Sequence, residues 1–169
     1  DLQKEFDYIY LAVGAQKSKP LKVKGIEKVS EGIVQPLELL ANIKSHRKIN
    51  LGENVVVLGG GNVAVDVART ANRLVGKDGS VKLVYRRTRN EMPADPEELE
   101  EAIEEGVEWM ELANPEQVQT KKGVVTGLQL RKMKLEADAE GRRPRPVPDG
   151  NKRKTLRCDT VIPAFGQEV

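Results

Sequence analysis

The sequence predicts an α/β fold in which a parallel sheet with helices is joined to an antiparallel β-meander. The first observation is a β-branched run at residues 54–59 that leads through a glycine-rich turn into an amphipathic stretch. The second is that strand-like and helix-like segments alternate from there to residue 112. The third is that residues 115–157 contain no convincing helix and show alternating apolar residues instead. A length of 169 residues suits one domain with a substantial core.

The composition is that of an ordinary globular protein and excludes several kinds of site. The net charge of +2, from 28 basic and 26 acidic residues, is too balanced to indicate binding to nucleic acid or a membrane. Cys158 and His46 are the only cysteine and histidine, which excludes an internal disulfide, a CxxC pair and a metal site built on several of these residues. With no apolar run of about 18 residues and no signal peptide, we expect a cytoplasmic protein.

The N-terminal part is predicted to be less regular than the rest. Residues 6–13 alternate and then run apolar, which is typical of a buried strand. Residues 16–34 are mixed and interrupted by glycine, which indicates a linker on the surface. Residues 36–47 favour a short helix with Pro36 in its first turn. The residues at helical spacing in it are Leu37, Leu40, Ala41 and Lys44.

From residue 53 the pattern predicts three parallel strands joined by two helices. The strands are expected at residues 54–59, 81–85 and 107–112. The second helix has Asp95 as its N-cap, Pro96 at its first position and Gly106 as its end. The first helix carries an apolar stripe and a glycine stop, formed by Val63, Val67, Ala71, Leu74, Val75 and Gly76.

The second half of the chain is predicted to be antiparallel. The residues KKG at 121–123 predict a hairpin turn, and Leu128, Leu130, Met133 and Leu135 alternate after it. Residues 141–153 are polar and rich in proline, which indicates a loop tip. Residues 155–164 return to an apolar strand.

The turn GGGNVA at residues 59–64 carries the chemistry. A helix N-terminus offers unbonded N–H groups and a partial positive charge to the pyrophosphate of a dinucleotide. Gly59 permits the tight turn, Gly61 allows the backbone to approach phosphate, and Ala64 takes the third small position. The context of strand, turn and helix therefore predicts a Rossmann-like dinucleotide-binding fold, the alternative being a glycine turn that binds nothing. We expect cofactor contacts from Gly59, Gly60, Gly61, Asn62 and Val63.

The end of the second strand predicts the kind of dinucleotide. NAD-binding proteins place an acidic residue there to hold the ribose hydroxyls, whereas this chain reads Tyr85-Arg86-Arg87-Thr88-Arg89. Arg86 and Arg87 are expected to pair with a 2′-phosphate, which favours NADP(H) over NAD(H). The alternative is that these arginines only solvate a strand end. The role of Arg89 stays open.

Other polar residues receive structural interpretations. Asp66 is expected to pair with Arg69 or Arg73 rather than with a cofactor, and Cys158 and Trp109 are expected in the core. No catalytic residue and no metal ligand is predicted.

Several motifs together carry a resemblance to a known family. They are GGGNVAVD, YRR, Met92-Pro93 before an acidic helix, EEGVEW and CDTVIPAFGQ, and they cover residues 52–167. The chain thereby resembles the NADPH-binding domain of the glutamate synthase small (beta) subunit and of related FAD- and NAD(P)-linked pyridine nucleotide oxidoreductases. In that family the NADPH domain is inserted into an FAD domain, and each ends with a strand of Asp-x-hydrophobic-Ala-x-Gly type.

This resemblance explains why FDYIYLAVGA at residues 6–15 and CDTVIPAFGQ at 158–167 nearly repeat each other. It implies that the first closes a segment of an FAD domain and the second closes the NADPH domain. Ala164, Phe165 and Gly166 would then lie beside the nicotinamide half of the cofactor. We expect an excised piece with a remnant FAD-domain strand at 1–15, a linker and short helix at 16–51, and an NADP(H)-binding domain at 52–169.

The resemblance also implies a function. The parent flavoprotein would use this domain to position NADPH for hydride transfer to FAD in the same polypeptide. Electrons would then pass through iron–sulfur clusters to a larger catalytic subunit or another acceptor. FAD and the clusters would belong to the parent only, so the chain alone is expected to be inactive. The alternatives are the same domain from a transhydrogenase-like or sulfide-dehydrogenase-like subunit, or a redox-inactive NADP-sensing Rossmann module. The final acceptor, the oligomeric state and the role of Met92-Pro93 stay open.

Overall fold

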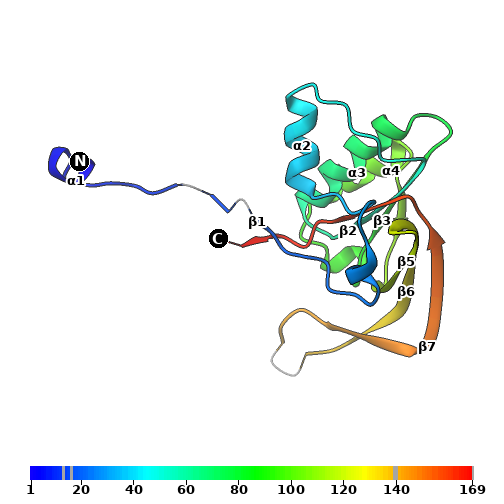
Figure 1. The fold of residues 1–169 in the computed structure, drawn as a ribbon. Coiled ribbons are helices and arrows are strands. Elements are labelled where there is room, and N and C mark those ends of the chain that lie inside the picture. Colours follow the sequence, from blue (N-terminus) through cyan, green and yellow to red (C-terminus); the bar gives the residue numbers. More distant parts are fainter. Residues whose placement is uncertain (13, 16, 139–140, 169) are drawn as a thin grey trace.

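The computed structural model describes residues 1–12, 14–15, 17–138 and 141–168, and its main body has three layers. The middle layer is a parallel sheet in the order β4-β3-β2-β8, of which Figure 1 labels β2 and β3. Its strands are β2 (Asn54–Leu58), β3 (Ser80–Val84), β4 (Glu108–Met110) and β8 (Thr160–Pro163). The outer layers are the helices α2 (Pro36–Lys44), α3 (Asn62–Val75) and α4 (Pro96–Glu104) and the antiparallel sheet of β5 (Ala113–Lys121), β6 (Val124–Glu136) and β7 (Arg145–Arg157). The predicted fold class is confirmed.

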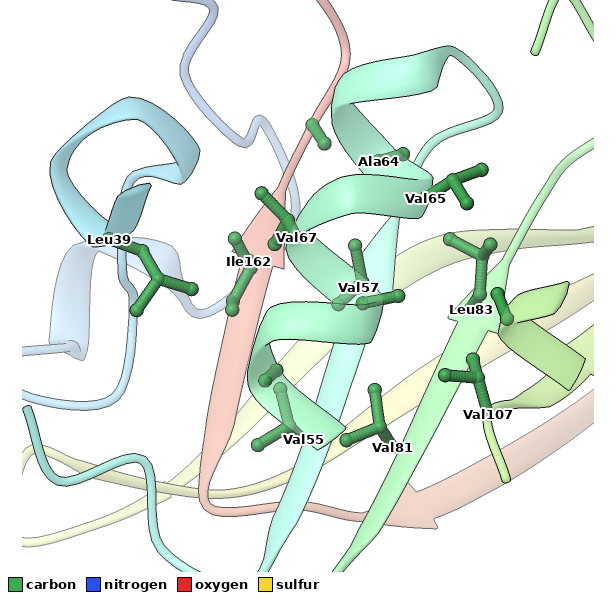
Figure 2. Close-up of a cluster of buried hydrophobic side chains, with 14 of the residues drawn as sticks. Leu39, Val55, Val57, Ala64, Val65, Val67, Val81, Leu83, Val107 and Ile162 are labelled. Carbon is green, nitrogen blue, oxygen red and sulfur yellow. The ribbon is translucent and has the colours of Figure 1, made fainter. Parts of the chain in front are cut away.

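Both faces of the parallel sheet are buried, which explains the continuous apolar run in β2. Val55 and Val57 face the helices, whereas Val56 and Leu58 face the antiparallel sheet. All four side chains are at most 1% exposed. Figure 2 shows the helix-side core, in which the labelled residues are Leu39, Val55, Val57, Ala64, Val65, Val67, Val81, Leu83, Val107 and Ile162.

The predicted stripe of α3 is only partly the buried face. Val67 and Ala71 are fully buried, but Leu74 is 40% exposed. The helix lies between α2 and α4 as well as on the sheet, so a wider arc of its surface is covered. Ala64, Val65 and Ala68 supply the rest of this arc. The predicted ends are confirmed, because Gly76 follows the helix with a φ of 72°.

The helix predicted at residues 36–47 is confirmed at Pro36–Lys44, although its buried face does not coincide with the residues named for their spacing. Leu39 is fully buried against the helix-side core, with Leu40 and Ile43 packed beside it, while Ala41 and Lys44 are exposed. Position 39 faces inward because α2 packs against α3, a contact that the local spacing does not reveal.

The buried strand predicted at residues 6–13 is wrong for residues 6–12. After a short helix α1 (Leu2–Glu5), these residues form no strand, and Tyr8 and Tyr10 are each 93% exposed. Figure 1 shows the segment reaching away from the three layers. A strand needs a neighbouring edge to pair with, and the described part of the chain offers it none. Val13 lies outside the described residues.

The segment predicted as a surface linker at 16–34 packs on the sheet instead. Leu21 is 6% exposed, and Val23, Ile26, Val29 and Ile33 pack against the core between the two sheets. The segment contains β1 (Lys17–Ser18) and the short helix η1 (Ile26–Lys28), and β1 pairs with β9 (Gln167–Glu168). Isolated bridges tie it to β5, β6 and β8. Residue 16 lies outside the described residues.

The polar loop predicted at 141–153 is also corrected. Most of it forms β7, which pairs with β6 through residues 145–148 and 153–157, with a register shift between the two stretches. Pro146 and Pro148 are compatible with this strand because β7 is the outer strand of its sheet. The apolar strand predicted at 155–164 is divided between β7 and β8 by Cys158 and Asp159.

The remaining predictions about elements are confirmed. The hairpin turn joins β5 to β6, and the Asp95 carboxylate caps α4 by accepting from the Glu97 amide at 2.8 Å. Among the described residues, no helix has the length and apolar character needed to cross a membrane.

Candidate nucleotide-binding cleft

A cleft of about 830 Å³ opens at the carboxyl ends of β2, β3 and β8. Ligands of open α/β sheets bind in this position because the loops that follow the strands converge there. All ten residues predicted to contact a cofactor line it, namely Gly59, Gly60, Gly61, Asn62, Val63, Arg86, Arg87, Ala164, Phe165 and Gly166.

The three glycines of the turn serve different purposes. Gly59 has a φ of 153°, and a Cβ there would lie 2.3 Å from the Ala164 carbonyl oxygen. A Cβ on Gly60 would lie 2.5 Å from the Tyr85 ring. At Gly61, by contrast, φ is −96° and a Cβ would meet no atom within 4 Å. The fold therefore requires the first two glycines, whereas the third leaves open space in the cleft.

The Gly60 contact predicts a stability effect that is separate from binding. The Tyr85 ring is 8% exposed, and its hydroxyl donates to the Glu91 carbonyl oxygen at 3.1 Å, so it has little room to move. Gly60→Ala should lower the free energy of unfolding by about 1–3 kcal/mol, the usual cost of overpacking. Chemical denaturation measures this, and an unchanged midpoint would show that the ring yields without cost.

Unbonded backbone amides surround the open space at Gly61. The amides of Gly60, Gly61, Asn62 and Val63 donate to no protein acceptor among the described residues. Asn62 and Val63 belong to the first turn of α3, a helix of 14 residues whose N-terminal N–H groups carry a partial positive charge. The turn can therefore bind an anion without any rearrangement of the backbone.

The Asn62 side chain connects this turn to the start of α4. Its Oδ1 accepts from the Asp95 amide at 3.1 Å, which leaves the Nδ2 donors for a ligand. Pro93 lines the cleft, whereas Met92 packs against the helix-side core. The hydrogen bond between Asn62 and Asp95 therefore holds the segment between β3 and α4 next to the glycine turn.

Arg86 and Arg87 follow β3 directly and differ in their surroundings. Arg86 is exposed, and no protein partner is found for it in the described part of the chain. Arg87 is half-buried, and its Nε donates to the Pro144 carbonyl oxygen at 2.9 Å, which leaves the outer nitrogens for a ligand. Arg89 does not line the cleft, because its guanidinium pairs with Glu100.

The cleft is strongly positive. Among its described lining residues are five basic side chains and no carboxylate, the basic residues being Lys19, Lys22, Arg86, Arg87 and Arg143. Sequence reasoning missed Lys19, Lys22 and Arg143, together with Tyr85 and Asn114. The run GRRPR at residues 141–145 was the available signal for Arg143, but nothing local indicated that it returns to this cleft.

The ion pairs predicted along α3 are wrong for Asp66. Arg69 and Arg73 pair with Glu105 instead, and Arg69 also with Glu101. The α4 carboxylates face these arginines because the two helices pack side by side. The pKa of Glu105 is lowered, chiefly by its hydrogen bond from Arg69.

Cys158 and Trp109 contribute to packing rather than to the cleft. Cys158 is fully buried, and burial together with the Asp159 charge raises the pKa of its thiol to about 12. Trp109 is partly buried against the helix-side core, with its ring centroid 6.3 Å from that of Tyr85. Within the described ranges no group of three or more His, Cys, Asp or Glu side chains could hold a metal ion.

Asp159 fixes β8 to the start of β2. Its Oδ2 accepts from the backbone amides of Asn54 at 2.8 Å and Glu53 at 3.0 Å. Burial raises the pKa of Asp159, but these hydrogen bonds, a further one from the Asn54 side chain and the charge of Arg157 outweigh it and hold the pKa below its usual value. Asp159 thus holds in register the strand that ends at the cleft.

Asp159→Asn should therefore destabilise the protein by about 1–2 kcal/mol at neutral pH, because hydrogen bonds to a charged acceptor are lost. A lowered carboxyl pKa contributes stability that is complete above the ordinary value near 4 and is lost as the pH falls through the lower folded value. The difference from the wild type should then shrink below about pH 4. Thermal unfolding across pH tests this, with the exposed turn residue Asp78 changed to Asn as the control. A difference that is constant with pH would contradict the proposed role of the charge.

Comparison with known proteins places the chain in a family. The model of the pyridine nucleotide-disulphide oxidoreductase family matches residues 2–169. The chain belongs to this family. The predicted resemblance is confirmed by this match together with a relative named as the small chain of glutamate synthase [NADPH].

Several curated relatives are named as a subunit or a small chain of an enzyme. The beta subunit of NADPH-Fe(3+) oxidoreductase from Geobacter sulfurreducens is 41% identical over 171 residues, which are 99% of this chain and 25% of the relative. The beta subunit of NADP(+)-dependent formate dehydrogenase from Moorella thermoacetica is 40% identical over 98% of this chain and 23% of the relative. The small chain of glutamate synthase [NADPH] from Azospirillum brasilense is 34% identical over 99% of this chain and 36% of the relative. The chain therefore spans less than half the length of these relatives.

A solved structure has a similar architecture. FprA from Mycobacterium tuberculosis in complex with NADPH has a TM-score of 0.76 over 99% of this chain and 51% of that chain. The identity is 19%, so the likeness concerns the fold.

Proposed function

We propose that the chain is the NADPH-binding region of a flavin-dependent oxidoreductase of the glutamate synthase small-subunit type. The observation that carries the proposal is the cleft at the end of β2. Four unbonded amides surround the open space at Gly61, and Arg86 and Arg87 stand beside them with no lining carboxylate among the described residues. This donor set suits a dinucleotide with an additional phosphate on its adenosine ribose.

The order of the sheet supports a direction for the bound dinucleotide. β2 lies between β3 and β8, so the glycine turn has Arg86 and Arg87 on one side and the residues after β8 on the other. The pyrophosphate would bind at the N-terminus of α3, with the adenosine half over β3. The nicotinamide half would then reach Ala164, Phe165 and Gly166.

The contribution of this chain to catalysis is to bind and orient. Bound NADPH supplies a hydride, and transfer requires the nicotinamide to be held near contact distance from its acceptor. Ala164 is buried, while Phe165 is 41% exposed at the edge of the cleft. The small backbone turn leaves room for the nicotinamide ring, and the exposed side of the cleft would face the FAD of the same protein.

The parent protein is the larger part of the proposal. Several curated relatives are named as NADPH- or NADP(+)-dependent oxidoreductase subunits. By analogy we propose that residues 1–15 belong to an FAD domain, that residues 52–169 form the NADP(H)-binding domain, and that electrons pass through iron–sulfur clusters to a partner subunit. The cytoplasmic location stays a prediction from the sequence.

The identities favour a second candidate for the acceptor. The Geobacter and Moorella relatives are 41% and 40% identical, compared with 34% for the Azospirillum glutamate synthase small chain. The alternative is therefore an electron-transfer subunit that passes its electrons to an acceptor outside the glutamate synthase reaction. The cleft described above would bind NADPH in that subunit in the same way.

Calorimetric titration with NADP⁺ and NAD⁺ tests the proposed function. We expect saturable binding with a clear preference for NADP⁺, and the preference should weaken as salt is added because it depends on exposed charges. Equal affinity for the two dinucleotides, or no binding, would overturn the proposal. Reduction of bound flavin by NADPH in the full-length protein tests the catalytic part.

A further inference from the structure

The β6–β7 hairpin returns to the cleft from a distant part of the sequence. Arg143, which precedes β7, lines the cleft, and its Nη2 donates to the carbonyl oxygen of Glu91. Pro144, the next residue, accepts from Arg87 Nε at 2.9 Å. Two adjacent hairpin residues therefore form hydrogen bonds with the loop that follows β3. Arg143 donates to a residue 52 positions earlier in the sequence, and Pro144 accepts from a residue 57 positions earlier.

Among the described residues, Arg143 has no carboxylate partner. Its described hydrogen-bond partner is a neutral carbonyl oxygen, which also accepts from the Tyr85 hydroxyl at 3.1 Å. The nearby Glu91 carboxylate is occupied by the amide and hydroxyl of Thr88. A guanidinium has five donors, so Arg143 keeps several for another acceptor. Three guanidinium groups without a lining carboxylate repel one another, and a bound dianion would relieve this.

The position of Arg143 indicates which phosphate it would meet. Arg143 contacts Glu91, and its neighbour Pro144 contacts the Arg87 side chain. Glu91 and Arg87 both belong to the loop after β3. The ribose of the adenosine half lies at this strand end in a dinucleotide-binding fold, whereas the pyrophosphate lies at the N-terminus of α3.

We propose that Arg143 is a third residue that recognises the 2′-phosphate, brought to Arg86 and Arg87 by the β6–β7 hairpin. This inference rests on the proposed function and deepens it. The hairpin is then part of the specificity for NADP(H), and Pro144 orients Arg87 through its carbonyl group.

The test compares Arg143→Ala with Arg145→Ala in the full-length protein. Arg145 lies two residues further along the same hairpin, is exposed and does not line the cleft, so it is a matched control. We expect Arg143→Ala to weaken NADP⁺ binding by roughly tenfold to a hundredfold, as for the loss of a charge-assisted hydrogen bond. NAD⁺ binding should change by no more than about twofold, since NAD⁺ has no 2′-phosphate. Arg145→Ala should change neither, and Arg143→Lys should restore part of the preference because it keeps the charge.

Three outcomes would overturn the inference. If Arg143→Ala lost equal affinity for NADP⁺ and NAD⁺, Arg143 would contact the pyrophosphate or have a purely structural role. An unchanged preference for NADP⁺ in Arg143→Ala would show that Arg86 and Arg87 suffice, and the proposed function would stand. A wild-type protein that showed no preference for NADP⁺ over NAD⁺ would contradict both the proposed function and this inference.

Discussion

Replacing Gly61 by alanine is expected to abolish most NADP(H) binding while the protein stays folded. The backbone at Gly61, with φ −96° and ψ 170°, is open to any residue, and a Cβ there meets no protein atom within 4 Å. The methyl group would instead occupy the space in which the phosphates approach the amides. We expect affinity to fall by roughly a hundredfold or more, because several hydrogen bonds to charged oxygens are lost together. The free energy of unfolding should change by less than about 1 kcal/mol, the cost of a weaker N-cap.

Gly76→Ala provides the opposite control at the other end of α3. Gly76 has a φ of 72° and lies outside the cleft, so alanine there should lower stability through backbone strain and leave binding intact. Calorimetric titration and chemical denaturation of both variants separate the two effects. Unchanged affinity in folded Gly61→Ala would contradict binding of the phosphates at this turn.

Replacing Arg86 and Arg87 together by alanine is expected to remove the preference for NADP(H). Two charge-assisted contacts to the 2′-phosphate are worth about 2–4 kcal/mol, so affinity for NADP⁺ should fall by roughly thirtyfold to a thousandfold. Affinity for NAD⁺ should stay nearly unchanged. The salt dependence of NADP⁺ binding should become similar to that of NAD⁺.

The single variants distinguish a binding role from a positioning role. Arg86 has no protein partner in the described part of the chain, so Arg86→Ala should alter binding alone. Arg87→Ala also removes the hydrogen bond to Pro144 and frees the hairpin, so it should lower stability slightly as well. The exposed pair Arg145 and Lys154, both outside the cleft, serves as a control for the loss of two positive charges. A similar loss of NADP⁺ affinity in that control would indicate that the overall positive charge of the protein attracts NADP⁺, rather than a specific site for its 2′-phosphate.

The parallel part of the fold could be predicted because its signals are local. The run from Val55 to Leu58 has apolar side chains on both faces, and Asp95 and Pro96 form a helix start within a few residues of sequence. The rest depends on contacts between distant segments. Leu21 is buried only because its segment lies between the two sheets, and β7 forms only because β6 offers an edge that tolerates Pro146 and Pro148.

The same distinction applies to the cleft. The glycine motif and the arginine pair follow their strands directly, so the sequence could predict where they meet. The reason for Gly60 is the Tyr85 ring, and Arg143 reaches the cleft through a hairpin that ends more than fifty residues after the loop it contacts. No local pattern encodes either contact. The strand predicted at residues 6–13 shows the converse for residues 6–12, because a suitable local pattern forms no strand where the described residues offer no neighbouring edge.

An amide NMR titration of the ¹⁵N-labelled protein with NADP⁺ tests directly whether the glycine turn binds the phosphates of the dinucleotide. We expect saturable shifts of the Gly60, Gly61, Asn62 and Val63 amides, which donate to no protein acceptor among the described residues. The same titration with NAD⁺ should move these amides at higher concentration. Saturable NADP⁺ binding that leaves the resonances of these four amides unshifted would show that the phosphates bind elsewhere.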